Sequence, residues 1–127
     1  MTKIIVVDDD PTNAGLIKML LELDGFQVIA CSDEEEALAA TQKETNAFVI
    51  DCNLARGATG IDILRKVRSD HTNAAKNTIV IMTSGDYRLE EETLEEGANQ
   101  FLLKPYSPDI LSKMLAELTT TGANHEQ

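Results

Sequence analysis

Short apolar runs alternate with longer amphipathic stretches along this chain of 127 residues. The runs are rich in Val, Ile and Phe and have the length of buried strands. Five strands are expected, at residues 4–7, 27–31, 47–51, 78–83 and 100–103. Between them, apolar residues recur three and four positions apart, which predicts a helix after each strand. This alternation indicates a parallel sheet wound with crossover helices.

Capping residues mark where the expected helices begin. Asp10-Pro11 and Ser107-Pro108 each pair a capping side chain with a proline at the first helical position. Ser32 and Glu35 have the spacing of a capping box for the second helix, and the third begins near Gly60. The fourth is expected over residues 87–96. In the last helix we expect five apolar residues to face inward: Ile110, Leu111, Met114, Leu115 and Leu118.

The fold we expect is α/β, a doubly wound five-stranded parallel sheet between two helical layers, which makes a three-layer sandwich. The flavodoxin-like strand order 2-1-3-4-5 is one common solution for such a sheet. With 43% hydrophobic residues, the chain has the size and content of one domain. We assign residues 1–119 to this domain and expect residues 120–127, which lack an apolar pattern, to form a flexible tail.

Four of the expected strands end in residues that can handle a metal ion and a phosphoryl group. They are Asp8 and Asp9 after the first strand, Asp51 at the end of the third, Thr83 and Ser84 at the fourth, and Lys104 after the fifth. Ligands of open α/β sheets bind outside the carboxyl ends of the strands. We therefore expect all these groups to gather at one edge of the sheet.

In the order 2-1-3-4-5 the first and third strands are neighbours, so Asp8, Asp9 and Asp51 would share one crevice. Three carboxylates so close repel one another unless a proton or a cation intervenes. Mg²⁺ prefers oxygen ligands and would satisfy the site, while Lys104 supplies a second positive charge. A carboxylate in this setting can attack phosphorus, and the Thr83 hydroxyl could donate to a phosphoryl oxygen.

These residues resemble the receiver domain of two-component response regulators, the family that includes the chemotaxis regulators. The resemblance covers residues 3 to 118 and rests on Val7-Asp8-Asp9, Asp51, Thr83-Ser84 and Lys104-Pro105, which form a specific set in this order. It implies that Asp51 is phosphorylated. It also implies a Mg²⁺ ligand set made of Asp9, Asp51, the backbone carbonyl of Asn53, and Asp8 acting through water.

The same resemblance implies a conformational switch at Thr83, Ser84 and Phe101, together with a cis peptide before Pro105. It implies a phosphoryl donor, either a histidine kinase or a histidine phosphotransfer protein. The domain would then either bind a downstream target protein, which the sequence does not identify, or pass the phosphoryl group onward. Asn53 matches a family position that tunes the phosphoryl lifetime. Such a domain is not a conventional enzyme, although it catalyses its own phosphorylation and slow dephosphorylation.

Two other functions fit the fold less well. An aspartyl-phosphate phosphohydrolase also uses a strand-end aspartate and Mg²⁺, but it usually needs a second aspartate two residues later, where this chain has Asn53. A flavin or nucleotide carrier would need a phosphate-binding loop, and residues 57–60 do not form a P-loop motif. The phosphoacceptor function is therefore preferred.

One segment departs from the receiver pattern. Receivers commonly follow the acceptor with a methionine-proline turn, but here Ala55 replaces the proline. Gly60 lies nine positions after Asp51, one more than the usual spacing. We therefore expect the loop over residues 54–60 to be one residue longer. Arg56 is expected in solvent, and the alternative is that it reaches the phosphoryl group or a partner.

Net charge and cysteine content limit the classes of binding partner and indicate the cellular compartment. A net charge of -11 and a pI near 4.4 argue against nucleic-acid or anionic-membrane binding, which needs a basic face. Cys31 and Cys52 have no short spacing, so reduced, buried thiols are expected. No apolar stretch reaches the roughly 20 residues that span a bilayer. We expect a soluble, cytoplasmic protein. The acidic stretch over residues 90–96 is by default a solvated helical face, although the family resemblance places an output surface there, which would suit a basic or polar partner.

Overall fold

A computed structural model describes residues 1–124, and side chains through residue 120. The strands form one parallel sheet in the order β2-β1-β3-β4-β5, which confirms the predicted α/β fold and strand order. In chain order the elements are β1 (Lys3–Val7), α1 (Pro11–Leu23), β2 (Gln27–Cys31), α2 (Glu34–Ala40), β3 (Ala47–Asp51), η1 (Ala55–Gly57), α3 (Gly60–Arg68), β4 (Ile79–Ser84), η2 (Tyr87–Leu89), α4 (Glu90–Glu95), β5 (Gln100–Leu103) and α5 (Pro108–Asn124).

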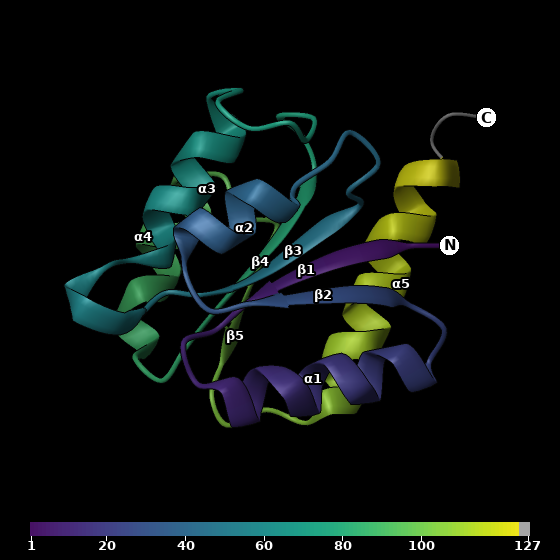
Figure 1. Ribbon diagram of the computed structural model, residues 1–127, viewed down its shortest axis with the longest axis horizontal. Helices are drawn as coiled ribbons and strands as arrows, with labels where there is room; N and C mark the ends of the chain where they lie inside the picture. Colours follow the sequence, from purple (N-terminus) through teal and green to yellow (C-terminus); the bar gives the residue numbers. More distant parts are fainter. Residues whose placement is uncertain (125–127) are drawn as a thin grey trace.

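Two hydrophobic cores lie on opposite faces of the sheet because successive strand residues point to opposite sides. In β1, Ile4 and Val6 belong to the core under α1 and α5, whereas Ile5 and Val7 belong to the core under α2 and α3. Figure 1 shows the same division, with α1 and α5 on one face of the sheet and α2, α3 and α4 on the other. The molecule is the expected three-layer sandwich.

The strand register aligns the carboxyl ends of the inner strands. Val7 of β1 lies opposite Ile50 of β3, Asp51 lies opposite Thr83 of β4, and Ser84 lies opposite Leu103 of β5. The residues that follow these strands therefore emerge at one edge of the sheet.

The caps of the first helices follow from short polar side chains. Asp10 caps α1 as predicted, because its carboxylate accepts the backbone N–H of Thr12 at 3.0 Å. The predicted capping box of α2 is wrong by one residue. Asp33 caps the helix, and Glu36 accepts the N–H of Ser32 at 2.6 Å. The carboxylate that reaches back is that of Glu36, and it binds Ser32, the residue directly after β2.

The last helix differs from the prediction in two respects. Leu111 and Leu115 are buried, but Ile110 is 49% exposed, because adjacent helical residues point about 100° apart and it falls outside the apolar stripe. The helix also continues to Asn124, past the expected end near residue 119. The Thr119 hydroxyl donates to the Leu115 carbonyl at 2.8 Å, which accommodates a threonine within the helix. Residues 125–127 of the predicted tail lie outside the described residues.

Within residues 1–124, every helix is too short or too polar to cross a bilayer. Cys31 and Cys52 are buried and unpaired with each other, as predicted.

Arg68, at the end of α3, links the two connections that lead into the amino ends of β4 and β5. Its half-buried guanidinium donates to the carbonyls of Gly97 at 2.8 Å, Lys76 at 2.9 Å and Thr78 at 2.6 Å, and to the side-chain oxygen of Asn99 at 2.9 Å. Burial lowers the pKa of this guanidinium, which still carries its charge at all relevant pH values.

We predict that Arg68→Ala lowers the free energy of unfolding by about 2 to 3 kcal/mol, because several carbonyls lose a charged donor at once. Arg88→Ala is the matched control, since the Arg88 side chain is 76% exposed and pairs only with Asp86 among the described residues. Urea unfolding followed by circular dichroism gives both values. Equal losses in the two variants would contradict the role assigned to Arg68.

Candidate functional site

Three carboxylates meet at the carboxyl edge of the sheet, as the sequence predicted. Asp8 and Asp9 follow β1, and Asp51 ends the neighbouring strand β3. One oxygen from each lies within 4.8 Å of the others. Asp8 is 4% and Asp51 8% exposed, whereas Asp9 faces solvent. This concentration of negative charge is unfavourable without a cation.

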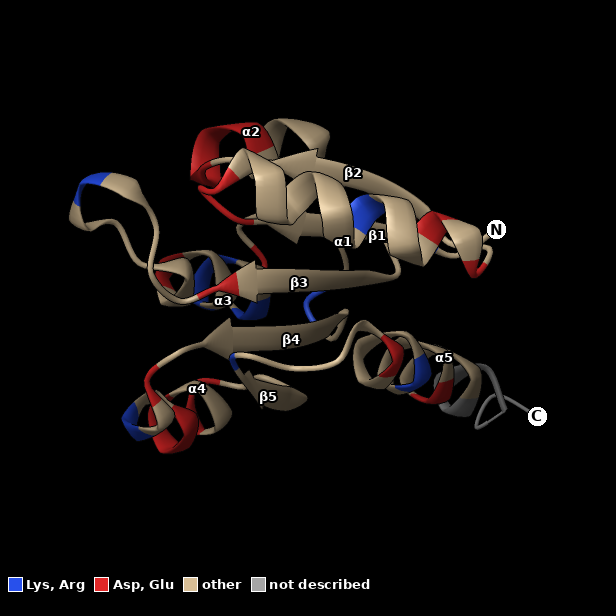
Figure 2. Ribbon diagram, turned by 90° about the horizontal axis from the view of Figure 1, so that it is seen from below, with Lys and Arg blue, Asp and Glu red and all other residues tan. Residues whose placement is uncertain are grey.

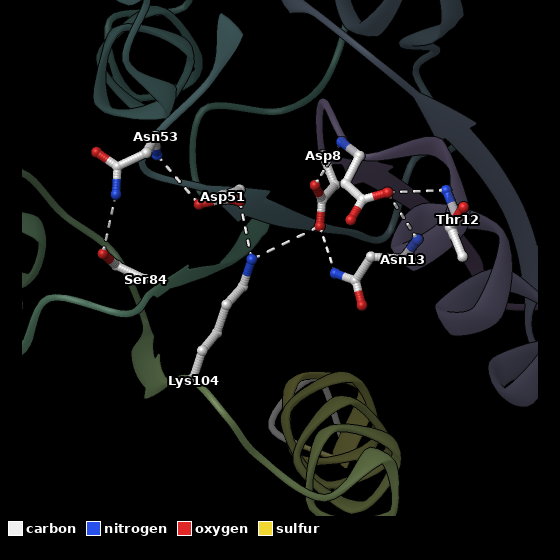
Figure 3. Close-up of polar contacts among 8 residues, drawn as sticks. Asp8, Thr12, Asn13, Asp51, Asn53, Ser84 and Lys104 are labelled. Carbon is white, nitrogen blue, oxygen red and sulfur yellow. Dashed lines mark hydrogen bonds and ion pairs between the residues drawn. The ribbon is translucent and has the colours of Figure 1, made fainter.

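Lys104 provides one cation. Its Nζ lies 2.8 Å from Asp51 Oδ2 and 3.6 Å from Asp8 Oδ2. Figure 3 shows the amine reaching between these two carboxylates. Burial of the amine opposes its charge, but the hydrogen bond and the charge of Asp51, helped by Asp8, outweigh burial and raise the pKa of Lys104. The peptide between Lys104 and Pro105 is cis, as the family resemblance implied. One lysine leaves the three acids with an excess of negative charge.

Asn53 lies on the other side of Asp51. Its backbone N–H donates to Asp51 Oδ1 at 3.1 Å, and its side-chain amide donates to the Ser84 hydroxyl at 3.3 Å. The same hydroxyl accepts the N–H of Asp86 at 3.0 Å. Within the part of the chain that the structure describes, no hydrogen bond reaches the carbonyl oxygen of Asn53. That carbonyl oxygen therefore has no hydrogen-bond donor among the described residues.

The residues predicted to act as a switch surround the end of β4. Thr83 is buried and lies directly opposite Asp51 in the sheet register. Ser84 is fully buried, and Phe101 of β5 is partly buried against the core beneath α2 and α3. Among the described contacts, no hydrogen bond joins the Thr83 hydroxyl to Asp51. The structure thus brings these residues to the site, while their roles stay predictions.

Sequence reasoning missed Asn13. This residue lies in the first turn of α1, and its side-chain amide donates to Asp8 Oδ2 at 2.6 Å. The backbone N–H of Asp10 donates to the other oxygen of Asp8 at 2.9 Å. The only sequence signal for Asn13 was its place one turn after the capping residue Asp10. A polar residue at such a position is usually an ordinary surface residue of the helix.

A cleft of about 660 Å³ opens from the acids. Its walls are apolar and come from α1, the segment between β5 and α5, and the first residue of α5; they include Leu16, Ile17, Leu20, Tyr106 and Pro108. Burial raises the pKa of the Tyr106 phenol. The cleft therefore joins a charged end at Asp51 to an apolar wall on α1.

The atypical loop after β3 projects beyond the edge of the sheet, as Figures 1 and 2 show. Its base is closed by hydrogen bonds from Leu54 N–H to the Ala58 carbonyl at 3.0 Å and from Gly60 N–H to the Cys52 carbonyl at 2.9 Å. At its tip Arg56 has a φ of 61°, which is uncommon for a residue with a side chain. Arg56 is exposed, in agreement with the prediction.

The thiol of Cys52 belongs to the residue after Asp51, but it is unreactive because it stays protonated. Burial, reinforced by the charge of Asp51, raises its pKa to about 12. Burial likewise raises the pKa of Cys31 to about 11. Both thiols are therefore protonated at neutral pH, and the protonated form is a poor nucleophile and metal ligand.

The sequence predicted a flavodoxin-like sheet with three acids and a lysine at one edge, and the structure has this architecture. Comparison with known proteins identifies the family. The family model for the response regulator receiver domain matches residues 4–116. The chain therefore belongs to the receiver domain family of two-component response regulators.

Individual relatives support this membership. The chain is 30% identical over 129 residues to the transcriptional regulatory protein CpxR of Klebsiella pneumoniae, a match that covers 100% of this chain and 53% of CpxR. It is 30% identical over 125 residues to the chemotaxis protein CheY1 of Helicobacter pylori, covering 94% of this chain and 98% of CheY1. The chain thus spans about half the length of CpxR but nearly all of CheY1.

Solved structures share the fold. A response regulator receiver domain protein from Clostridium thermocellum superposes with a TM-score of 0.86 at 27% identity, covering 97% of this chain and 98% of that one. The response regulator TrrA of Thermotoga maritima, solved in complex with Mg²⁺ and BeF, gives a TM-score of 0.78 at 21% identity and covers 93% and 99% of the two chains.

Proposed function

We propose that Asp51 is the phosphoryl acceptor of this receiver domain. The observation that carries the proposal is the setting of its carboxylate, with Lys104 Nζ 2.8 Å from one oxygen and the Asn53 N–H 3.1 Å from the other. Two donors fix the orientation of the nucleophile, and phosphoryl transfer depends mainly on such alignment. Attack by a carboxylate oxygen forms an O–P bond to Asp51. The P–N bond of a phosphohistidine breaks, and the imidazole leaves with its electron pair and takes up a proton from water.

The site fits a Mg²⁺ ion. Asp9, Asp51 and the free carbonyl of Asn53 would bind it, and Asp8 would act through water. Three carboxylates against one lysine leave a charge that a hard divalent cation neutralises. When bound, Mg²⁺ would supply positive charge to the phosphoryl oxygens. TrrA, which has the same fold, was solved with Mg²⁺ and BeF.

For the switch, the register supports Thr83 as the hydroxyl donor. It lies opposite Asp51, one strand away, at the end of β4. Its movement toward a phosphoryl group would vacate space beside Phe101, the partly buried ring on the next strand. The change would reach η2 and α4, which follow β4 directly.

The donor would be a phosphohistidine on a helix of a kinase or phosphotransfer protein. The apolar wall of the cleft supports this choice, because it leads from Asp51 to exposed apolar side chains of α1, namely Leu16 at 47% and Met19 at 53% exposure. An amphipathic helix laid against α1 would bury them and bring its histidine to the acceptor.

The proposals on the target, on nucleic-acid binding and on the domain bounds rest on the charge of the chain and on how much of its relatives it covers. Several acids of α4 are exposed and suit a basic or polar target, although Arg65 of α3 pairs with Glu92 and Glu96. CpxR is a transcriptional regulator of which this chain matches half, so the absence of nucleic-acid binding stays a prediction that rests on the net charge of -11. A receiver domain over residues 1–119 and a cytoplasmic location are likewise proposed.

The proposal is tested by incubating the protein with Mg²⁺ and acetyl phosphate and recording the intact mass. Asp9→Asn should slow formation of the single phosphoryl adduct on the order of 100-fold, the scale for losing one electrostatic element of a reaction site. Asp10→Asn is the matched control, because Asp10 caps α1 and belongs to no ligand set. It should react like the unmodified protein.

Three outcomes contradict the proposal. One is that the unmodified protein gains no adduct, and another is that adduct formation is equally fast with chelator in place of Mg²⁺. Repeated turnover of phosphoesters without a stable adduct would instead favour the phosphohydrolase.

A further inference from the structure

Asp8 is held by two neutral donors from its own loop and helix. Asn13 Nδ2 lies 2.6 Å from Asp8 Oδ2, and the backbone nitrogen of Asp10 lies 2.9 Å from Asp8 Oδ1. Figure 3 shows the Asn13 amide pointing to the Asp8 carboxylate. Lys104 also faces Asp8 Oδ2 but at 3.6 Å, since its closer contact is Asp51. The short bond from Asn13 is thus the main side-chain restraint on Asp8.

Removing this restraint would affect the cation as well as the acid. The terminal torsion of an aspartate is broad, so its side chain sets no orientation without a partner. Without Asn13, the Asp8 carboxylate would keep the N–H of Asp10 but could turn its other oxygen toward Lys104. Lys104 would then be shared more evenly between Asp8 and Asp51, and the three acids would lose their common geometry.

We propose that Asn13 is a positioning residue of the acidic site: it orients Asp8 for Mg²⁺ and keeps Lys104 on Asp51. This inference rests on the proposed function of the acids as a Mg²⁺ site. A neutral amide suits the task, because it donates a hydrogen bond without adding a positive charge that would compete with the ion. An acid at this position could not donate while ionised, and it would add a fourth negative charge.

The test measures the Mg²⁺ dissociation constant by amide NMR titration, with no phosphodonor present. Asn13→Ala should weaken Mg²⁺ binding about tenfold, the lower end for losing a partner that orients a metal ligand. Thr12→Ala is the matched control from the same helical turn, because among the described residues the Thr12 side chain makes no hydrogen bond. It should leave the constant within about twofold of the unmodified protein.

A second variant covers the case in which Asn13→Ala does not fold. Leucine has the same number and branching of side-chain heavy atoms as asparagine, and Asn13 lines the cleft with Leu16 and Ile17, so Asn13→Leu removes the donor without opening a cavity. It should weaken Mg²⁺ binding to the same extent. Unfolding in chelator monitors stability in each variant.

A double-mutant cycle then asks whether Asn13 acts through Asp8. In an Asp8→Ala background, Asn13→Ala should cause no further loss of Mg²⁺ affinity. A further loss there, or an unchanged constant in the single variant of a folded protein, overturns the inference. Absence of Mg²⁺ binding by the unmodified protein would instead overturn the proposed function on which the inference rests.

Discussion

Asp51→Asn is expected to eliminate the phosphoryl adduct that the unmodified protein forms with Mg²⁺ and acetyl phosphate. The amide has no oxygen nucleophile with a full negative charge, and losing a nucleophile costs on the order of 10³-fold or more in rate. The fold should survive, because an asparagine oxygen still accepts the N–H of Asn53 that Asp51 accepts at 3.1 Å. Intact-mass spectrometry, with amide NMR spectra to verify folding, measures both effects.

Asp86→Asn is a demanding control for this result. Asp86 is another acid near the carboxyl edge, two residues after β4. Its carboxylate pairs with Arg88 and does not belong to the group formed by Asp8, Asp9 and Asp51. It should form the adduct at the rate of the unmodified protein. An adduct of full yield in folded Asp51→Asn would place the acceptor on a different residue and disprove the assignment.

Gly60→Ala is expected to cause the largest loss of stability, about 3 kcal/mol. A Cβ atom at Gly60 would lie 2.1 Å from the backbone oxygen of Asp51 and 2.6 Å from Ile50 Cγ2. No rotamer change relieves a clash with backbone, so either the start of α3 or the end of β3 must move. Since Asp51 ends that strand, the acidic site would be displaced as well.

Gly15→Ala is the matched control substitution, and it is expected to raise the free energy of unfolding where Gly60→Ala lowers it. Gly15 lies within α1, and a Cβ there would have no neighbour within 4 Å. Alanine should stabilise the helix by about 0.5 to 1 kcal/mol, because glycine loses more backbone entropy on folding. Urea unfolding of both variants gives the two free energies. A loss in Gly60→Ala no greater than the gain in Gly15→Ala would show that the contact with Asp51 yields easily.

The sheet and the main site residues could be predicted because they depend on patterns within single strands. A buried parallel strand is a short apolar run, so β3 could be located from Phe48, Val49 and Ile50 alone. Once the strand order was assumed, the position of Asp51 beside Asp8 and Asp9 followed from geometry. The four strand ends therefore met where they were expected.

The features that could not be predicted depend on where individual side chains turn. Asn13 looks like a surface residue in the sequence, and only the path from β1 into α1 aims its amide at Asp8. Ile110 has the right chemistry for a core residue, but its rotation about α5 leaves it in solvent. The turn at Arg56, with a φ of 61°, also carries no sequence signal, because glycine and asparagine are the usual residues there.

Because its residues come from the ends of different strands, the acidic site with its lysine is complete only when the whole sheet has formed. Asp8, Asp51 and Lys104 lie at the ends of three different strands, and Lys104 directly follows β5, the last strand of the sheet along the chain. A folding intermediate or nascent chain that has formed β1 and β3 without β5 holds the acids but lacks the amine. Under the proposed function, such a partial structure should accept no phosphoryl group efficiently.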